Sequence, residues 1–593
     1  MSIEELQKQS NTNVAEKANL IWGIATHLYG EYKPHEYGKV ILPMTVIKRF
    51  EDCLKDTKQD VLAKAKELDS KNLSPAVKDT LLKKAAKRNF YNTSRFDFKS
   101  LLADSENIAA NFIDYLQGFS DNVKEIISYF KFGDEISRMS QNDLLFTIIT
   151  EFDSKKADMS PDHVTSQDMG YIFEELTRKF SESYDEQAGA HFTARDIIYL
   201  MTELLVAPEK EEIREHGCSK TAYDMTMGTS QMLACLDERL KDINSNTDLR
   251  CFGQEFNPET FAIAKSDMLI KGKDAENMKF GDTLSNDQFE DYQFDYIISN
   301  PPFGIDWKKE KESVEAEAKK GFDGRFGPGL PNISDGQLLF LLNGVKKLKD
   351  TGRMAIIQNG SSLFTGDAGS GPSEIRRYII ENDRLEAIVQ LPTDLFYNTG
   401  IATYIWVVDG VRAKPLNRTG KVQLIDASKC FVKRRKNIGS KRVDLDDRCI
   451  DLIIQAFKGF DNKEYTDNDI SVESKVFDNN YFGYTKLTVE TASVDEKGNK
   501  IMKKGKPVAE KGKTDSEIVP LQEDIEEYFK KNVLPYNPNA FIDSTKTKIG
   551  YEIPFTRVFY KFVAPKDSDE ILKEIKALEE EETKLMKELF ENE

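Results

Sequence analysis

The tetrapeptide Asn300-Pro301-Pro302-Phe303 carries the clearest chemistry in this sequence, because it directly follows an apolar run at residues 295–299. An exocyclic amino nitrogen on a base ring is a poor nucleophile, since its lone pair is delocalised. The Asn300 side-chain oxygen and the Pro301 carbonyl can accept its two hydrogens and draw it towards a tetrahedral state. The prolines stiffen the loop because their φ is fixed, and Phe303 offers a face on which a flipped-out base can stack. The four residues are predicted to be catalytic, whereas the same string elsewhere is typically a turn.

A second group of residues has the types and order of an adenosyl-cofactor site. Residues 224–230 join a short apolar run to a helix-like segment, and such a turn directs backbone N–H groups at a ligand. The turn holds one glycine where nucleotide-binding turns usually hold two or three, so a plain strand-to-helix turn is the alternative. Glu255 ends the next apolar run, where an acid commonly binds ribose hydroxyls, and Asp282 can accept from an adenine amino group. The predicted cofactor-binding residues of these loops are Asp224, Gly228, Thr229, Ser230, Glu255 and Asp282.

The elements that must position these residues are predicted by hydrophobic patterning. Between residues 160 and 445, short apolar runs alternate with amphipathic stretches. The expected strands are 222–226, 249–253, 294–299, 354–358, 387–391, 404–408 and 422–425, and the expected helices include 231–240, 258–270, 336–348 and 373–381. This alternation predicts an α/β domain with a mostly parallel sheet and ligands at the carboxyl ends of its strands. Residues 1–155 carry apolar residues at three- and four-residue steps, as in 15–28 and 40–54, which predicts a helical domain.

The region after residue 445 has two distinctive segments. Residues 494–515 are rich in lysine and glycine and nearly lack large apolar side chains, which predicts an exposed hairpin or linker. Near the end of the chain, apolar residues follow alternating four- and three-residue steps, at Ile571, Ile575, Leu578, Leu585 and Leu589. Such a seam indicates a helix that packs either on its own domain or on a partner helix.

Composition describes an ordinary globular protein with an acidic balance. Of 593 residues, 39% are hydrophobic and 31% charged, which excludes a disordered or fibrous chain. The 83 Lys and Arg against 101 Asp and Glu give a net charge of −18, which repels a DNA backbone. Contact with nucleic acid therefore requires a partner or a local basic patch. One candidate for DNA phosphate contact, or alternatively a solvated surface, is the cluster Lys433, Arg434, Arg435, Lys436, Lys441 and Arg442.

Metal binding, secretion and membrane insertion are all disfavoured by the sequence. The six cysteines form no CxxC pair and the five histidines join no Cys/His cluster, so no metal site is expected. Scattered, reduced cysteines suit the cytoplasm. The N-terminal residues show no basic-then-apolar signal, and no apolar run is long enough for a membrane span. We expect a cytoplasmic protein.

The motifs together resemble the modification (M) subunit of type I restriction–modification systems, an S-adenosylmethionine-dependent DNA adenine-N6 methyltransferase. The resemblance runs through most of the chain and is carried by 189–196, 253–255, Asp282, 300–303, 396–401 and 551–556. In the first of these segments the family usually has a proline where this chain has Ala194. The resemblance implies that His191, Phe192 and Thr193 contact the cofactor.

The resemblance also implies an architecture and a set of partners. The expected fold is an N-terminal helical domain (1–155), a Rossmann-like methyltransferase domain (156–445) and a C-terminal region (446–593) with a subunit-docking helix. The expected cofactor is S-adenosylmethionine, with no metal. The expected partners are duplex DNA, a specificity subunit that recognises the DNA target, and a restriction endonuclease subunit.

One departure from the family pattern concerns the glycine turn, which commonly reads Asp-Pro-x-Cys-Gly-Ser/Thr-Gly-Gly. Here Met225, Met227, Ser230 and Gln231 replace the proline, the cysteine and two glycines. A side chain at residue 230 is expected to face the crowded turn, and this leaves a non-catalytic scaffold subunit as an alternative.

Two further alternatives concern the acceptor and a loop. The activating motif also serves cytosine N4 and a protein glutamine amide. Residues 321–336, which include Arg325, either close over the extruded base or form a simple surface excursion.

Overall fold

The computed structural model describes residues 16–183, 193–302, 304–397, 399–496, 498–503, 505–562 and 567–590. The chain folds into a large unit, Met1–Ile553, and a small unit, Pro554–Glu593. Within the described residues, none of the helices is both long and apolar enough to cross a membrane.

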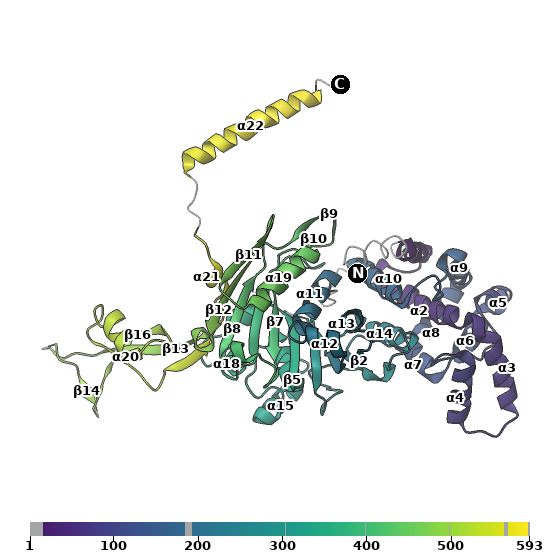
Figure 1. Cartoon of the computed structure of the whole chain (residues 1–593), viewed down its shortest axis with the longest axis horizontal. Helices are drawn as coiled ribbons and strands as arrows, with labels where there is room; N and C mark the ends of the chain where they lie inside the picture. The colour runs from purple at the N-terminus through teal and green to yellow at the C-terminus, as the bar shows by residue number, and fades with distance from the viewer. Residues whose placement is uncertain are drawn as a thin grey trace. The chain divides into compact units, whose positions relative to one another are not determined.

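The N-terminal part of the large unit is helical, as its periodicity predicts. The expected helix at 40–54 is confirmed as α2, and its residues are almost all buried. Helix α2 spans Gly38–Leu54. Further helices of this part are α3 (Lys58–Asp69), α4 (Pro75–Ala86), α5 (Phe98–Leu102), α6 (Ile108–Gln117), α7 (Asp121–Tyr129), α8 (Phe132–Gln141) and α9 (Leu144–Phe152). Figure 1 shows them gathered beside α14 (Pro258–Ile270). There the Tyr129 ring meets Phe261 with centroids 4.8 Å apart, and Lys265 pairs with Glu125 at 2.8 Å.

A ten-stranded sheet forms the centre of the large unit, in the order β11-β12-β8-β6-β7-β5-β4-β1-β2-β3. Its strands are β1 (Ser219–Asp224), β2 (Asp248–Glu255), β3 (Met278–Phe280), β4 (Phe294–Ser299), β5 (Leu348–Asn359), β6 (Leu385–Gln390), β7 (Thr403–Asp409), β8 (Lys421–Asp426), β11 (Lys463–Asp467) and β12 (Ile470–Asp478). All seven predicted strands are confirmed. The sheet includes strands that lie after residue 445, the expected end of the methyltransferase domain, because β12 pairs with β8.

The four expected helices are confirmed as α13 (Gln231–Ile243), α14, α16 (Gln337–Lys347) and α18 (Gly371–Glu381), each within three residues of its expected bounds. Further helices in this part of the chain are α10 (Ser166–Ser183), α11 (Arg195–Val206), α12 (Lys210–His216), α15 (Lys311–Ala318), α17 (Ser361–Phe364) and α19 (Asp447–Gly459). Crossovers between parallel strands are right-handed. Helix α13, which leads outward from β1 to β2, and α16, which leads the opposite way from β4 to β5, therefore cover opposite faces. Strands covered on both faces read as continuous apolar runs, which is why the sequence located them.

The strand order reverses between β1 and β4. From β1 the chain moves outward to β2 and β3, and it then returns to place β4 on the other side of β1. We call the end of the sheet where β1, β4 and β6 finish its carboxyl end, and the other its amino end. In open α/β sheets ligands bind at the carboxyl end, beside such a reversal.

The C-terminal third adds three smaller sheets, within the described residues, to the large unit. One hairpin consists of β9 (Val432–Ile438) and β10 (Lys441–Asp444). A second sheet contains β13 (Gly483–Ala492), β16 (Ala509–Pro520), β17 (Ala540–Ile542) and β18 (Lys548–Tyr551), beside α20 (Ile525–Asn532). The exposed hairpin expected within 494–515 is confirmed as β14 (Met502–Lys503) and β15 (Lys506–Pro507).

The small unit contains α21 (Phe555–Phe559) and α22 (Ser568–Phe590). Helix α22 confirms the helix that the heptad-like seam predicts. Three of the seam residues are exposed, with Ile571 at 44%, Ile575 at 49% and Leu578 at 64%.

Candidate active site

The reversal point brings the predicted catalytic loop next to the end of β1. Ser299, the last residue of β4, donates from Oγ to Asp224 Oδ1 at 2.7 Å. The Thr226 N–H donates to the same carboxylate oxygen at 3.1 Å, and the Thr226 and Ser299 hydroxyls lie 2.9 Å apart. The turn after β1 and the loop after β4 are thereby fixed to each other.

Asp224 is a buried carboxylate at this junction, with 1% of its surface exposed. Burial raises the pKa of Asp224 to about 7, while the hydrogen bonds from Ser299 and Thr226 lower it and the nearby Glu255 charge raises it further. A carboxylate that titrates near neutrality at the carboxyl end of a sheet is a typical feature of a functional site.

The turn after β1 keeps a glycine-like path although it holds a serine at residue 230. Gly228 has φ +53° and Ser230 has φ +68°, a left-handed conformation that costs a non-glycine residue about 1–3 kcal/mol. The Ser230 hydroxyl is fully buried and lies 4.0 Å from Met278 Sδ. The serine side chain therefore packs into the core, whereas the sequence predicts that it faces the turn, where it would crowd a ligand.

The other replaced residues also find partners in the interior. Met227 packs on Gly253, where an added Cβ would lie 2.2 Å from the Met227 sulfur. Gln231 accepts a hydrogen bond at Oε1 from Arg195 at 3.0 Å, and its carboxamide lies against Gly170 of α10. The altered turn is therefore accommodated by close packing around it.

Glu255 joins the end of β2 to the turn after β1. Its Oε2 accepts the Gly228 N–H at 2.9 Å, and its Oε1 accepts the Asn257 N–H at 2.7 Å. Burial raises the pKa of Glu255. Thr229, on the same turn as Gly228, is 5% exposed. The predicted ribose-binding acid and the glycine turn are thus brought together.

Asp282 lies in the loop after β3 and has one carboxylate oxygen committed to that loop. Its Oδ1 accepts the Leu284 N–H at 2.9 Å, the Ser285 N–H at 2.7 Å and the Ser285 hydroxyl at 2.9 Å. The loop is held in place by these bonds. Within the described residues the second carboxylate oxygen accepts no hydrogen bond, so it can accept one from a ligand.

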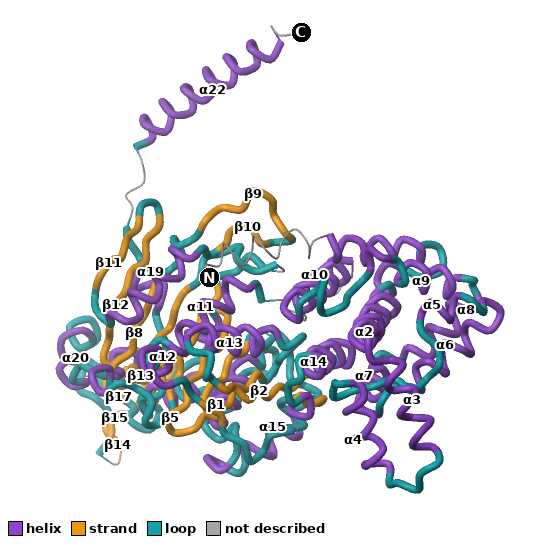
Figure 2. Tube along the Cα trace, turned by 45° about the vertical axis from the view of Figure 1, so that its right-hand side comes forward, coloured by secondary structure: helices purple, strands orange, loops and turns teal. Residues whose placement is uncertain are grey.

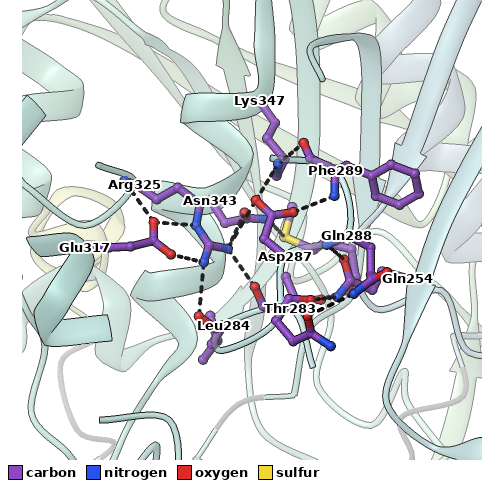
Figure 3. Close-up of polar contacts among 12 residues, drawn as sticks. Gln254, Thr283, Leu284, Asp287, Gln288, Phe289, Glu317, Arg325, Asn343 and Lys347 are labelled. Carbon is purple, nitrogen blue, oxygen red and sulfur yellow. Dashed lines mark hydrogen bonds and ion pairs between the residues drawn. The ribbon is translucent and has the colours of Figure 1, made fainter. Parts of the chain in front are cut away.

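A buried arginine, Arg325, holds the main chain of the loop that follows Asp282. Figure 3 shows the Arg325 guanidinium pointing at the carbonyls of Thr283, at 2.6 Å, and Leu284, at 3.0 Å, while Glu317 pairs with it. Asn343 Oδ1 accepts from the same guanidinium at 3.1 Å. The segment around Arg325 therefore packs into the fold as a support, and this residue belongs to neither a lid nor a surface excursion.

The Asn300 side chain has a fixed orientation and an unused acceptor. Its Nδ2 donates to Thr193 Oγ1 at 2.9 Å. Its Oδ1 is buried, and within the described residues it accepts no hydrogen bond. Buried polar atoms almost always have a partner, so this amide oxygen is placed to accept from a ligand.

The remaining predicted residues fall into three groups. Pro301 and Pro302 follow Asn300 at the carboxyl end of the sheet. His191, Phe192 and Phe303 lie outside the described residues. Of the basic cluster, Lys433, Arg435 and Lys436 are exposed on β9, whereas Arg434 pairs with Asp444.

Sequence reasoning named Thr193 and Arg325 but missed the roles that these two residues have in the structure. The hydroxyl of Thr193 fixes the Asn300 amide, a role that no local pattern reveals because 107 residues separate the two. Arg325 lies in a glycine-rich loop, and only its burial discloses that it holds the Asp282 loop.

Comparison with known families decides the identity of this arrangement. Residues 164–497 match the N-6 DNA Methylase family, and residues 17–152 match the HsdM N-terminal domain. The chain belongs to the N-6 DNA methylase family. The resemblance to modification subunits of type I restriction–modification systems is thereby confirmed, and so is the DNA adenine-N6 methyltransferase activity that it implies. Adenine N6 is favoured over cytosine N4 and protein glutamine.

Individual relatives agree with the family. The chain is 24% identical over 535 residues to the type I restriction enzyme MjaIX methylase subunit of Methanocaldococcus jannaschii, covering 86% of each. It is 28% identical over 282 residues to the HindI methylase subunit of Haemophilus influenzae, covering 47% of this chain and 58% of that one. The crystal structure of a type I methyltransferase subunit from Streptococcus thermophilus has the same fold, with a TM-score of 0.61 at 21% identity, covering 79% of this chain and 97% of that one.

Proposed function

We propose that this N-6 DNA methylase binds S-adenosylmethionine at the reversal point of its sheet, and that Asn300 activates the amino group of an adenine flipped out of duplex DNA. The observation that carries the proposal is the buried Asn300 Oδ1, which accepts no hydrogen bond from the described residues. Because Nδ2 of the same amide is engaged by Thr193, the oxygen is the end available to the incoming amino group.

The residues around the reversal point fit an adenosyl cofactor. The turn at Gly228, Thr229 and Ser230 leads into the N-terminus of α13, Glu255 suits ribose hydroxyls, and the second carboxylate oxygen of Asp282 suits an adenine amino group. Asp224 adds a buried carboxylate, which favours a cationic ligand. When bound, the cofactor supplies an electrophilic methyl group on its sulfonium.

The task left to the protein is to position and activate the amino nitrogen. Asn300 Oδ1 accepts one of its hydrogens and the Pro301 carbonyl accepts the other, which localises the lone pair on nitrogen. Pro302 restricts the loop, and Phe303 is the proposed stacking partner of the base. The cofactor-contacting stretch of His191, Phe192 and Thr193 completes the proposed site, with Thr193 also orienting the amide.

We infer that the chain works in a complex with a specificity subunit, which recognises the DNA target, and with a restriction endonuclease subunit. The exposed seam Ile571, Ile575 and Leu578 on α22 supports a helical partner, since a soluble helix with one apolar edge is stabilised by covering it. The two relatives named above are subunits of type I restriction enzymes, which supports the same inference.

Calorimetric titration of the purified chain with S-adenosylmethionine tests the cofactor site, with Asp224→Ala as the control. The expected result is micromolar binding that the substitution abolishes. Absence of binding by the wild-type chain, alone and with its specificity subunit present, would overturn the proposed cofactor site. The chain would then be a non-catalytic scaffold subunit. Mass spectrometry of the DNA product then identifies the methylated base.

A further inference from the structure

The β9–β10 hairpin leaves the sheet at the same end as the active site. Strand β8 runs parallel to β6, which is antiparallel to β7, which is in turn antiparallel to β5. Strands β8 and β6 therefore point in the same direction as β5, β4 and β1. The hairpin begins at Val432, shortly after β8 ends at Asp426. Figure 2 shows it at the upper edge of the large unit, about level with the turn between β11 and β12.

A buried ion pair attaches this hairpin to the start of α11. Lys441, the first residue of β10, is 1% exposed, and its Nζ donates to Asp196 Oδ2 at 2.9 Å and to the Leu395 carbonyl at 3.0 Å. The Leu445 N–H reaches the same Asp196 oxygen at 2.9 Å. Lys441 therefore serves as an anchor and is unavailable to DNA, although the sequence groups it with the basic cluster.

Main-chain hydrogen bonds to the loop between β6 and β7, residues 391–402, strengthen this attachment. The Arg442 N–H donates to the Asp394 carbonyl at 2.8 Å, and the Ser440 N–H donates to the Tyr397 carbonyl at 2.7 Å. That loop follows β6 and so lies at the carboxyl end of the sheet as well.

The anchored end of the hairpin and the activating amide share one support. Asp196 lies in the first turn of α11, three residues after Thr193, whose hydroxyl fixes Asn300. A hairpin held at Asp196 is therefore held at a constant position relative to the Asn300 loop.

The exposed side chains of the hairpin form a cationic group that the protein itself leaves uncompensated. Lys433, Arg435, Lys436 and Arg442 are exposed, and among the described residues none of the four has an ion-pair partner. Arg434 differs, since it pairs with Asp444. Neighbouring like charges destabilise a two-stranded ribbon. The four side chains add no stabilising polar contact to the described part of the fold, although the chain as a whole has a net charge of −18. A bound polyanion would relieve the repulsion between these cations.

We propose that the β9–β10 hairpin is a phosphate-binding arm, in which Lys433, Arg435, Lys436 and Arg442 contact the backbone of the duplex next to the flipped adenine. Backbone contacts of this kind position a duplex without reading its sequence, which suits a subunit whose target is chosen elsewhere. The proposal rests on the proposed function only in taking DNA as the substrate.

The test compares DNA binding of two charge-matched variants of the full-length chain. One variant replaces the four hairpin cations (K433A, R435A, K436A, R442A). The control replaces four exposed lysines around β14–β16 (K500A, K503A, K506A, K511A). Fluorescence anisotropy with a mixed-sequence duplex, measured over a range of salt concentrations, gives the slope of log K against log salt. Titration with S-adenosylmethionine is run in parallel on each protein.

The hairpin variant is expected to lose about 0.9 from that slope for each phosphate contact removed, or about 3–4 in total. The control variant should lose much less, and both should bind S-adenosylmethionine like the wild-type chain. Equal losses in the two variants would overturn the proposal, and so would a wild-type chain that binds no duplex at the lowest salt. A chain that shows the hairpin effect but binds no cofactor would refute the proposed function alone.

Discussion

The two ends of the central sheet differ in the groups that surround their buried acids. At the amino end, Arg353 of β5 pairs with Glu386 of β6 and, at 3.4 Å, with Asp409 of β7. Arg418 adds a second guanidinium, 2.7 Å from Glu386. All four side chains are buried. At the carboxyl end, the buried Asp224 accepts hydrogen bonds from the Ser299 hydroxyl and the Thr226 N–H, and no cation among the described residues contributes to its pKa.

The difference separates stability from function within one sheet. At the amino end two arginines face two acids, although burial still raises the pKa of Asp409 to about 8. At the carboxyl end Asp224 is held by hydrogen bonds from Ser299 and Thr226, and Asn300 Oδ1 accepts no hydrogen bond from the described residues, as is typical of sites that receive a ligand. Substitutions at the two ends should therefore change different measured quantities.

The largest effect on stability is expected at the amino end. Glu386→Gln removes the carboxylate shared by Arg353 and Arg418, and it should lower the free energy of unfolding by about 3–5 kcal/mol in a urea titration. Asp350→Asn is the matched control, because Asp350 pairs with Arg412 at 3.7 Å with both side chains exposed, and it should cost less than about 1 kcal/mol. Similar losses in the two variants would contradict the distinction between the ends.

At the carboxyl end, Asn300→Ala should abolish function and leave stability almost intact. Removing the acceptor for the amino group should slow methylation by about 10²–10³-fold or more, by analogy with the loss of one transition-state hydrogen bond. Titration with S-adenosylmethionine should give the wild-type affinity. A variant that loses cofactor binding in parallel with methylation would show that Asn300 supports the fold of the site.

A pH titration sharpens the role of Asp224, whose pKa is raised by burial to about 7. Since the ionised form attracts the cationic cofactor, the affinity for S-adenosylmethionine should rise about tenfold between about pH 6 and about pH 8. Asp224→Asn should remove the part of this rise that does not come from the ligand's own titration. An identical pH profile in the variant would exclude Asp224 as the titrating group.

The same pKa has a consequence of opposite sign for stability. The folded protein holds the Asp224 proton more tightly than the unfolded chain does. The contribution of this group to folding stability therefore falls as pH rises from about 4 to about 7. Melting temperatures of Asp224→Asn and the wild-type chain should differ most above about pH 7, with the variant gaining relative to the wild type.

The smallest effect is expected at the altered turn. Ser230→Gly removes the penalty of a left-handed serine at φ +68°. Because glycine loses about 0.5–1 kcal/mol more on folding, the net gain in stability should be about 1 kcal/mol, with cofactor affinity nearly unchanged. Gly228→Ala, at φ +53°, should act in the opposite direction. A large gain in cofactor affinity for Ser230→Gly would show that the serine obstructs the site.

Much of the fold could be predicted from the sequence, because strands buried between two helical layers are read as apolar runs. Strands β4 and β7 were located in this way almost to the residue. Strand β3 was missed because it contains three residues, and β11 and β12 because exposed residues interrupt their apolar pattern.

The sequence by itself determined the family, seven strands of the sheet and the loop that carries Asn300, since each motif or strand is formed by residues close together along the chain. Tertiary structure alone decided which residues act on them. It made Thr193 the partner of the Asn300 amide, turned Lys441 from a surface cation into the buried partner of Asp196, and placed Arg325 under the Asp282 loop. The physical reason is that a local pattern records whether a segment is buried, whereas the partner of a polar side chain is set by packing between segments far apart in the chain.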